Sequence, residues 1–198
     1  MSRHVLTFAI ALLAVFSSLS SAHPHVFADV TVKALFSEKG FVGIKNHWVY
    51  DEMYSAAMMS SADKDKDGKL SSSENSWMQS AILEPIEKNN YFNYVQYKSD
   101  FLKAERIQDF KAKIVDRKLV LDFTVGFSVP VTADYTMLVI VVSDPSNYIQ
   151  MTTDMDNSDV DSPELLEVEY FSDALDGLTL FRGFRSEIEG LYLRYKKK

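Results

Sequence analysis

The amino-terminal part of the chain alternates apolar and polar residues. Every second residue is apolar over residues 26–36, and residues 41–50 repeat the pattern, which is the period of half-buried strands. A three-residue loop of residues 38–40, with Gly40 in the left-handed conformation, would join them as a hairpin. This register puts both apolar sets on one face and sets His47 opposite Thr31.

The spacing of apolar residues then becomes helical. Residues 51–62 and residues 72 to about 84 each predict a helix, and Pro85 marks the end of the second because proline fits poorly inside a helix. The expected inward stripes are Met53, Tyr54, Ala57 and Met58 in the first helix, and Trp77, Met78, Ala81 and Ile82 in the second.

The rest of the chain predicts mainly strands. The expected strands are residues 91–97, 106–115, 118–125, 136–142 and 148–153. The acidic residues 154–169 suggest a solvated loop or a weak helix start, and residues 178–198 fit strand or helix, with a basic end expected to fray.

These elements predict an α+β fold. We expect an antiparallel β-sheet with an EF-hand-like helix-loop-helix, residues 51–84, inserted after the first hairpin. Residues 23–198 would form a single domain.

The first 22 residues have the three parts of a secretory signal peptide: a basic start at Arg3, an apolar run from Val5 to Phe16, and a small-residue stretch ending at Ala22. The cleavage pattern favours a cleaved signal over the alternative of an uncleaved anchor. No later apolar stretch is long enough to span a membrane, so the mature protein is expected outside the cytoplasm without direct membrane insertion.

Charge and cysteine content exclude several classes of partner and of site chemistry. The formal net charge of -7 argues against nucleic acid as a partner. The absence of cysteine excludes disulfides, a thiol nucleophile and a thiolate metal site. A small exported domain without disulfides often uses a metal ion to stabilise its fold.

The segment from Asp63 to Glu74 matches the twelve-residue EF-hand calcium loop. Gly68 permits the sharp turn at position 6, and Leu70 is expected to anchor the loop to neighbouring structure. The predicted Ca²⁺ ligands are the side chains of Asp63, Asp65, Asp67 and Glu74, the backbone carbonyl of Lys69, and Ser71, which typically acts through water.

The calcium loop is expected to be structural rather than regulatory. Such loops normally occur in pairs, and no second complete loop is visible. The acidic residues Asp154, Asp156, Asp159 and Asp161 lack the glycine and the closing glutamate. A single loop outside the cytoplasm fits the weak class, with dissociation constants of ~10⁻⁴ to 10⁻³ M.

Signal cleavage would leave His23 and His25 at the new terminus, separated by Pro24. Residues two apart on an extended chain point to the same side, so both imidazoles can face one ion such as Zn²⁺ or copper. The hairpin register brings Asp51 and Glu52 close to His25, which makes them the expected third and fourth ligands. An equally open alternative is that both histidines belong to a solvated chain end.

An enzymatic role is not expected. His47 lies six residues along the strand from the level of His25, about 20 Å away at ~3.4 Å per residue, which is too far for one ion to bridge. Because it stands beside Trp48, it is interpreted as a packed strand residue. A copper enzyme with an N-terminal histidine brace is an alternative that would need another histidine close to His23. The sequence has no phosphate loop, nucleophile elbow or His-Glu-x-x-His motif.

Three segments together resemble a known family: residues 23–27 (HPHVF) after the signal, residues 48–52 (WVYDE), and the calcium loop. The chain is similar to the ZevA-like family of uncharacterised periplasmic proteins, often labelled as the periplasmic component of an ABC-type transport system. Its better-understood members work with a nickel/cobalt-type membrane permease in zinc acquisition. The likeness is clearest over residues 23–100, and the chain lacks the long His-rich stretch of dedicated zinc-capturing proteins.

The resemblance implies a periplasmic accessory protein of an inner-membrane permease for zinc, nickel or cobalt. In this interpretation His23, His25 and Asp51 or Glu52 offer a transient transition-metal site, while calcium stabilises the helical insert. The alternative is a calcium-stabilised binding or adhesion module in which the histidines are incidental.

Overall fold

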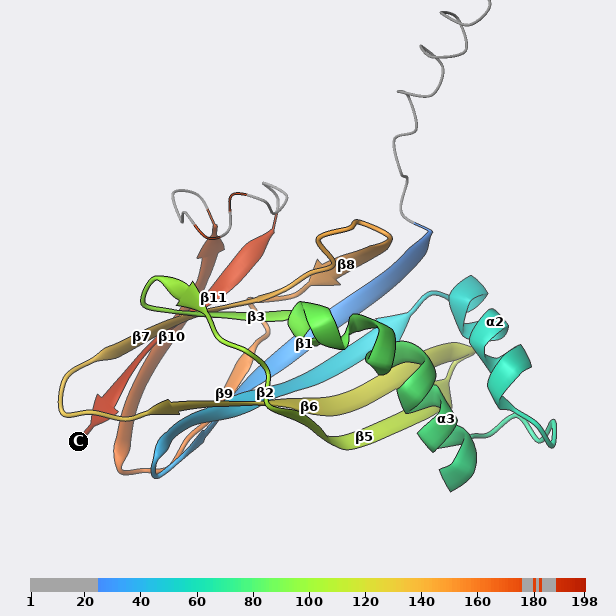
Figure 1. Cartoon of the computed structure of the whole chain (residues 1–198), viewed down its shortest axis with the longest axis horizontal. Helices are drawn as coiled ribbons and strands as arrows, with labels where there is room; N and C mark the ends of the chain where they lie inside the picture. The colour runs from blue at the N-terminus through green and yellow to red at the C-terminus, as the bar shows by residue number, and fades with distance from the viewer. Residues whose placement is uncertain (1–24, 176–179, 181, 183–187) are drawn as a thin grey trace, which may run out of the picture.

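The computed structural model describes residues 25–175, 180, 182 and 188–198. Within them, two β-sheets lie against each other and two helices lie at the end away from the C-terminus (Figure 1). Within this part of the chain, every helix is too short or too polar to cross a membrane. The predicted signal peptide and His23 lie outside the described residues.

The first hairpin forms in the predicted register. Strands β1 (Val26–Ser37) and β2 (Gly40–Tyr50) are antiparallel, and Thr31 pairs with His47. The turn is one residue shorter than predicted, because Gly40 pairs with Ser37 and joins the ladder. Gly40 has φ +127°, and a Cβ there would lie 2.2 Å from the Val129 carbonyl oxygen, so both backbone angle and space require glycine.

The first sheet has the strand order β5-β6-β2-β1-β8, and β9 also pairs with β1. Its further strands are β5 (Arg106–Val115), β6 (Lys118–Pro130), β8 (Ile149–Thr153) and β9 (Asp159–Asp161). Since β8 and β9 run parallel to β1, this sheet is mixed.

The second sheet is antiparallel and has the order β10-β11-β7-β3-β4. Its strands are β3 (Asn93–Tyr97), β4 (Asp100–Phe101), β7 (Thr136–Val142), β10 (Leu166–Ala174) and β11 (Glu189–Lys197). The α+β class and the inserted helices are therefore confirmed, but the prediction of one antiparallel sheet is wrong. Strand periodicity shows which residues alternate, whereas the division into sheets depends on long-range pairing.

The helical insert follows the hairpin directly. Helix α2 (Glu52–Ala62) and helix α3 (Ser72–Leu83) flank the loop, and a kinked 3₁₀ segment η1 (Glu84–Phe92) continues from α3 with Pro85 in its first turn. Met78 and Ile82 are buried as predicted, but Met53 is 76% exposed and Trp77 is 40% exposed. The buried residues of α2 are Ser55 and Ala62, and neither belongs to the predicted stripe.

The carboxyl-terminal third differs most from the prediction. The acidic segment 154–169 contains β9 and the start of β10 instead of a loop or weak helix. The basic terminus is not frayed, because Lys197 pairs with Leu166 and its N–H donates to the Thr132 carbonyl. Cross-strand ion pairs explain how such charged residues form strands, as Glu169 on β10 binds Arg194 on β11 at 2.6 Å.

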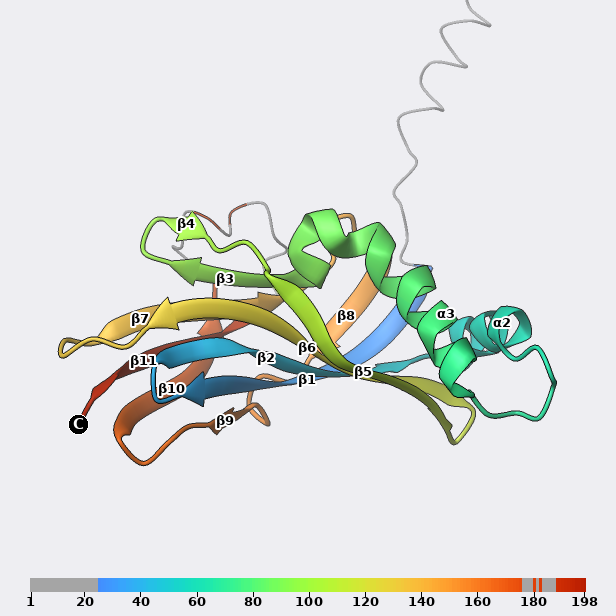
Figure 2. The same cartoon turned by 60° about the horizontal axis from the view of Figure 1, so that its bottom comes forward.

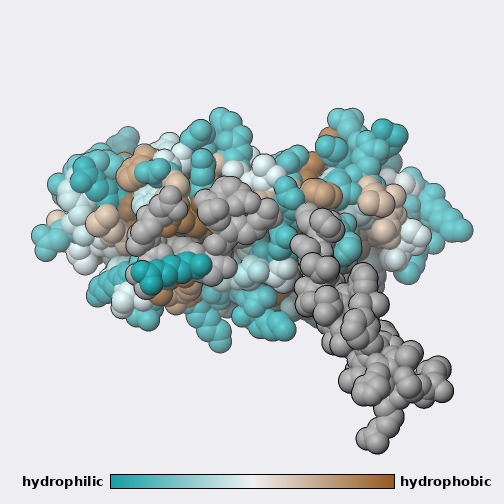
Figure 3. Space-filling view, turned by 90° about the horizontal axis from the view of Figure 1, so that it is seen from above, coloured by the Kyte–Doolittle hydropathy of each residue, from teal (hydrophilic) through white to brown (hydrophobic). Residues whose placement is uncertain are grey.

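The core lies between the two sheets (Figure 2). Phe36 of the first sheet packs edge-on against Tyr195 of the second, with ring centroids 4.8 Å apart. Trp48 and Phe123 are fully buried beside each other on β2 and β6. Burial of each such side chain stabilises the fold by roughly 1.5–3 kcal/mol. The face in Figure 3 is mostly hydrophilic, with small apolar patches.

Candidate metal centre

Three carboxylates converge at the loop between α2 and α3. Asp63, Asp65 and Asp67 each offer an oxygen, and these oxygens all lie within 4.8 Å of one another. Asp65 and Asp67 are exposed, and Asp63 is half-buried at the C-cap of α2. An all-oxygen group of this kind suits a hard cation such as Ca²⁺ and can hold a metal ion.

The loop backbone holds these carboxylates in place. Gly68 donates its N–H to Asp63 Oδ2 at 2.9 Å, and Lys69 donates to Asp67 Oδ1 at 2.8 Å. Gly68 has φ +76°, while a Cβ there would meet nothing within 4 Å. The position therefore needs glycine for its backbone angle and not for space, as the sequence motif predicts.

Glu74 bridges the two ends of the loop. Its Oε1 accepts the Lys64 N–H at 2.7 Å, and its Oε2 accepts the Ser71 N–H and hydroxyl at 2.9 and 2.7 Å. The hydrogen bonds from Ser71 and Lys64 lower the pKa of the Glu74 carboxyl, so it is ionised at neutral pH.

Ser71 and Glu74 also form the capping box of α3. Sequence reasoning assigned both residues to calcium and missed this structural role, although the Ser-x-x-Glu spacing was its visible signal. The hydrogen bonds fix Glu74 beside the three aspartates, but its oxygens lie outside their 4.8 Å group. Its bidentate ligation, and the roles of the Lys69 carbonyl and Ser71, stay predictions.

The negatively charged side chains of the loop repel one another. The Asp67 N–H acts to lower the pKa of Asp65, but loss of solvent contact and the carboxylates of Asp67 and Glu74 raise it more. The Lys64 ammonium lies 5.9 Å from the centre of the Trp77 ring. Leu70 packs against the main core and anchors the loop, as predicted.

His25, the first described residue of the histidine terminus, lies exposed at the start of β1. Its ring centroid is 5.4 Å from that of Tyr148, and its N–H donates to the Tyr148 carbonyl. Among the described residues, His25, Asp51 and Glu52 do not form a group with ligand atoms within 4.8 Å of one another.

Both proposed carboxylate partners of His25 have other contacts. Asp51 caps α2 by accepting the Tyr54 N–H at 2.9 Å, and its second oxygen accepts the Phe27 N–H of β1 at 2.9 Å. Partial burial acts to raise the pKa of Asp51, but these backbone hydrogen bonds outweigh it and the net pKa is lowered. Glu52 forms an exposed ion pair with Arg117 at 2.9 Å.

Asp51 therefore lies beside Phe27, two residues after His25 on β1, as the register predicts. The Glu52 side chain is instead bound to Arg117 in the β5–β6 turn. The structure brings the Asp51 carboxylate to the amino-terminal end of β1. Its contribution to a transition-metal site with His23 stays a prediction.

His47 lies on the outer face of the first sheet. Its Nδ1 is 2.7 Å from Asp122 Oδ1, and Lys113 contacts the other oxygen of Asp122 at 3.1 Å. The His47 side chain is 44% exposed, so it is less packed than the sequence suggested.

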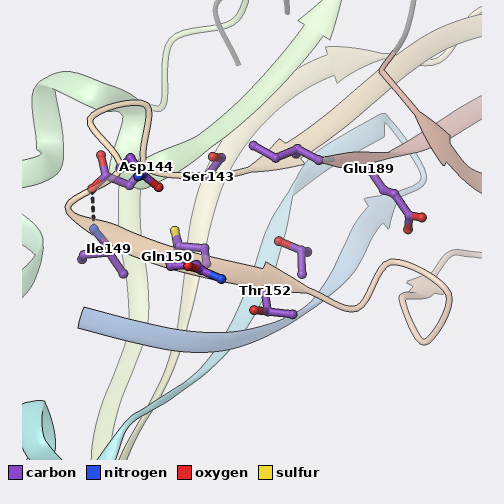
Figure 4. Close-up of a pocket in the computed structure, with 10 residues that line it drawn as sticks. Ser143, Asp144, Ile149, Gln150, Thr152 and Glu189 are labelled. Atoms are coloured by element: carbon purple, nitrogen blue, oxygen red, sulfur yellow. Dashed lines mark hydrogen bonds between the residues drawn. The ribbon is translucent and has the colours of Figure 1, made fainter. Parts of the chain in front are cut away.

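Acidic residues also gather at Asp144 and in the segment from Asp154 to Asp161. In Figure 4, Asp144 lies at a pocket of about 370 Å³ beside β8, but its oxygens hold its own turn by accepting the N–H groups of Ser146 and Ile149. Asp154 binds Asn157, and Asp159 binds Lys33. Within the described part of the chain, neither place gathers three potential ligands around one point.

No curated protein matches the chain. The family model described as "Protein of unknown function (DUF1007)" matches residues 8–171, which include the β1–β2 hairpin and the acidic loop. This match agrees with the resemblance to an uncharacterised family and attaches no activity to it. The chain belongs to the DUF1007 family.

Proposed function

We propose that this protein is an exported, calcium-stabilised accessory protein of a divalent transition-metal permease. Calcium would occupy the Asp63–Glu74 loop and hold the helical insert together. The mature terminus, with His23, His25 and Asp51, would offer a transient zinc-type site for exchange with the permease.

The calcium part is supported by the convergence of Asp63, Asp65 and Asp67 within 4.8 Å, which is the observation that carries the proposal. These acids repel one another, as the raised pKa of Asp65 reflects, and a divalent cation would remove that repulsion. The turn at Gly68 and the anchoring Leu70 are further features of the EF-hand calcium loop.

The transition-metal part is supported by placement at the amino-terminal end of β1. His25 is exposed there, and Asp51 binds the adjacent Phe27 N–H, so an imidazole and a carboxylate share one surface. The pairing with a permease, the periplasmic location and the choice of zinc, nickel or cobalt come from the family resemblance.

A second candidate function is a calcium-stabilised binding module. An apolar pocket of about 290 Å³ on the second sheet favours it, because Met137 and Phe171 there are 68% and 61% exposed. The Phe171 ring stacks on Tyr192 at 5.1 Å, which gives a flat aromatic surface for a ligand.

Zinc titration after calcium loading tests the main proposal. The protein is prepared with His23 as its authentic first residue, saturated with calcium, and titrated with Zn²⁺ by calorimetry. We expect one zinc site, and a His23→Ala/His25→Ala double variant should bind at least about tenfold more weakly. Calcium-loaded protein without zinc affinity would reject the transition-metal role and favour the binding module.

A further inference from the structure

Asn75 connects the calcium loop to the edge of the first sheet. It directly follows Glu74, and its Nδ2 donates to the backbone carbonyls of Leu70 at 3.1 Å and Ser71 at 3.4 Å. Its Oδ1 accepts the Ala112 N–H of β5 at 2.6 Å. One half-buried side chain thus joins loop positions 8 and 9 to a strand 37 residues away.

The partner of Asn75 is a strand edge. Among the described residues, β5 is the outermost strand of the first sheet, so on one side its N–H groups face no described strand. The β5–β6 ladder is interrupted between Gln108 and Lys111, and Asp109 in this bulge has φ +53°. The Ala112 N–H follows the bulge and finds its acceptor in Asn75, which satisfies an amide of a buried residue.

A second side chain attaches the insert to the sheet but does not reach the loop. Ser55 of α2 accepts the Leu119 N–H of β6 at 2.7 Å and donates to the Asp51 carbonyl at 2.6 Å. Ser55 and Asn75 therefore perform the same task on neighbouring strands. Only Asn75 also holds carbonyl groups of the calcium loop.

We infer that Asn75 is a positioning residue for the calcium loop and couples calcium binding to the β5 edge. EF-hand loops normally support each other in pairs, and here the sheet edge takes the place of the second loop. Asn75 holds the Leu70 and Ser71 carbonyls against β5. It thereby determines where the last part of the loop lies relative to the Glu74 carboxylate. This inference rests on the proposed calcium site.

Calcium affinity in matched variants tests this inference. Asn75→Ala removes the link between loop and sheet, whereas Ser55→Ala removes an equivalent strand contact without touching the loop. We expect Asn75→Ala to weaken calcium binding at least about tenfold, the loss typical when a group that orients a ligand is removed. Ser55→Ala should lower stability but change the calcium affinity less than about twofold.

Amide hydrogen exchange gives a readout that a purely structural role would not move. In the unmodified protein, calcium should slow exchange at Ala112 more than at Leu119, and Asn75→Ala should abolish this calcium effect at Ala112. If Asn75→Ala fails to fold, Asn75→Ser gives the same comparison, because its shorter side chain cannot reach both partners.

The outcomes separate the two proposals. Unmodified protein that binds no calcium would overturn the proposed calcium site and this inference with it. Unmodified protein that binds calcium, together with unchanged affinity in Asn75→Ala or equal losses in Asn75→Ala and Ser55→Ala, would overturn the positioning role alone.

Discussion

Acidic residues lie at both ends of helix α2, and they are used differently at each end. After the helix, Asp63, Asp65 and Asp67 bring oxygens within 4.8 Å of one another. Before it, Asp51 joins β1 to the first turn of α2, and Glu52 pairs with Arg117. Carboxylates of the same chemistry form a group that could hold a cation in one place and separate structural contacts in the other.

The difference follows from where the partners come from. The loop carboxylates lie within five residues, so the turn at Gly68 and the loop amides are enough to bring them together. Asp51 instead meets the amide of Phe27, 24 residues earlier in the chain. A short motif can therefore encode a cation site, while a site formed between chain segments competes with the hydrogen bonds that the fold requires.

The largest expected effect is the loss of calcium stabilisation in Glu74→Gln. Calcium at about 100 times its dissociation constant should raise the free energy of unfolding of the unmodified protein by roughly 2.7 kcal/mol. Glutamine can keep the capping-box contact with Ser71, but it loses the acceptor of the Lys64 N–H and the charge that we propose ligates calcium. Urea unfolding with and without calcium should therefore show the gain in the unmodified protein and none in the variant.

Glu38→Gln provides the control for Glu74→Gln, because it removes the same charge in the exposed β1–β2 turn. It should keep the full calcium gain. An equal calcium gain in Glu74→Gln would exclude the loop as the calcium site. A general loss of stability in Glu74→Gln without calcium would show that the capping role dominates.

At the other end of α2, Asp51→Ala should reduce the free energy of unfolding by about 1–2 kcal/mol, because it removes the helix cap and the acceptor of the Phe27 N–H. Asp51→Asn keeps one acceptor oxygen, so it can retain one of the two hydrogen bonds and should lose less stability than Asp51→Ala. As a zinc ligand, however, asparagine lacks the charge, so zinc affinity should fall by about tenfold in both variants.

The neighbouring variant Glu52→Ala serves as control. Its ion pair with Arg117 is exposed, so the loss in stability should stay below about 1 kcal/mol. Zinc binding by Asp51→Asn as tight as in the unmodified protein would assign Asp51 to folding alone. The two ends of α2 would then differ completely in function.

The smallest expected effect concerns Asp122 on the outer face of the first sheet. Partial burial acts to raise its pKa, but the hydrogen bonds from His47 and Lys113 outweigh this and lower it below the ordinary value of 3.8. A lowered carboxyl pKa contributes stability above the unfolded value, and this contribution is lost as the pH falls through the folded value.

Urea unfolding as a function of pH measures this contribution. Asp122→Asn should cost at most about 1 kcal/mol at neutral pH, because the cluster is partly exposed. The difference from the unmodified protein should disappear as the pH falls below about 3.8. A difference that stays constant over this range would assign the effect to packing instead of charge.

The local elements were predictable because their signals are short-range. The alternation from Val26 to Phe36 matches β1, the helical spacing matches α2 and α3, and the predicted strands 106–115 and 136–142 coincide with β5 and β7. The calcium-type loop was predictable for the same reason. Its acids, its glycine and its anchoring Leu70 occupy fixed positions in a single turn of chain.

The missed features depend on residues far apart in sequence. Strand β10 pairs along its length with β11, where its acids face Arg194 and Lys196, whereas the acidic composition alone suggested a loop. Ser55 and Asn75 look like ordinary polar helix residues until Leu119 and Ala112 are placed beside them.

The sequence by itself determined the hairpin, the two helices and the acidic loop, because each arises from periodicity or from a motif whose parts are already neighbours. Tertiary structure alone decided that two sheets form, that Asp51 serves the backbone, and that the loop rests on β5 through Asn75. The physical reason is hydrogen bonding: buried amides and carboxylates must find partners, and those partners are known only once distant segments have met.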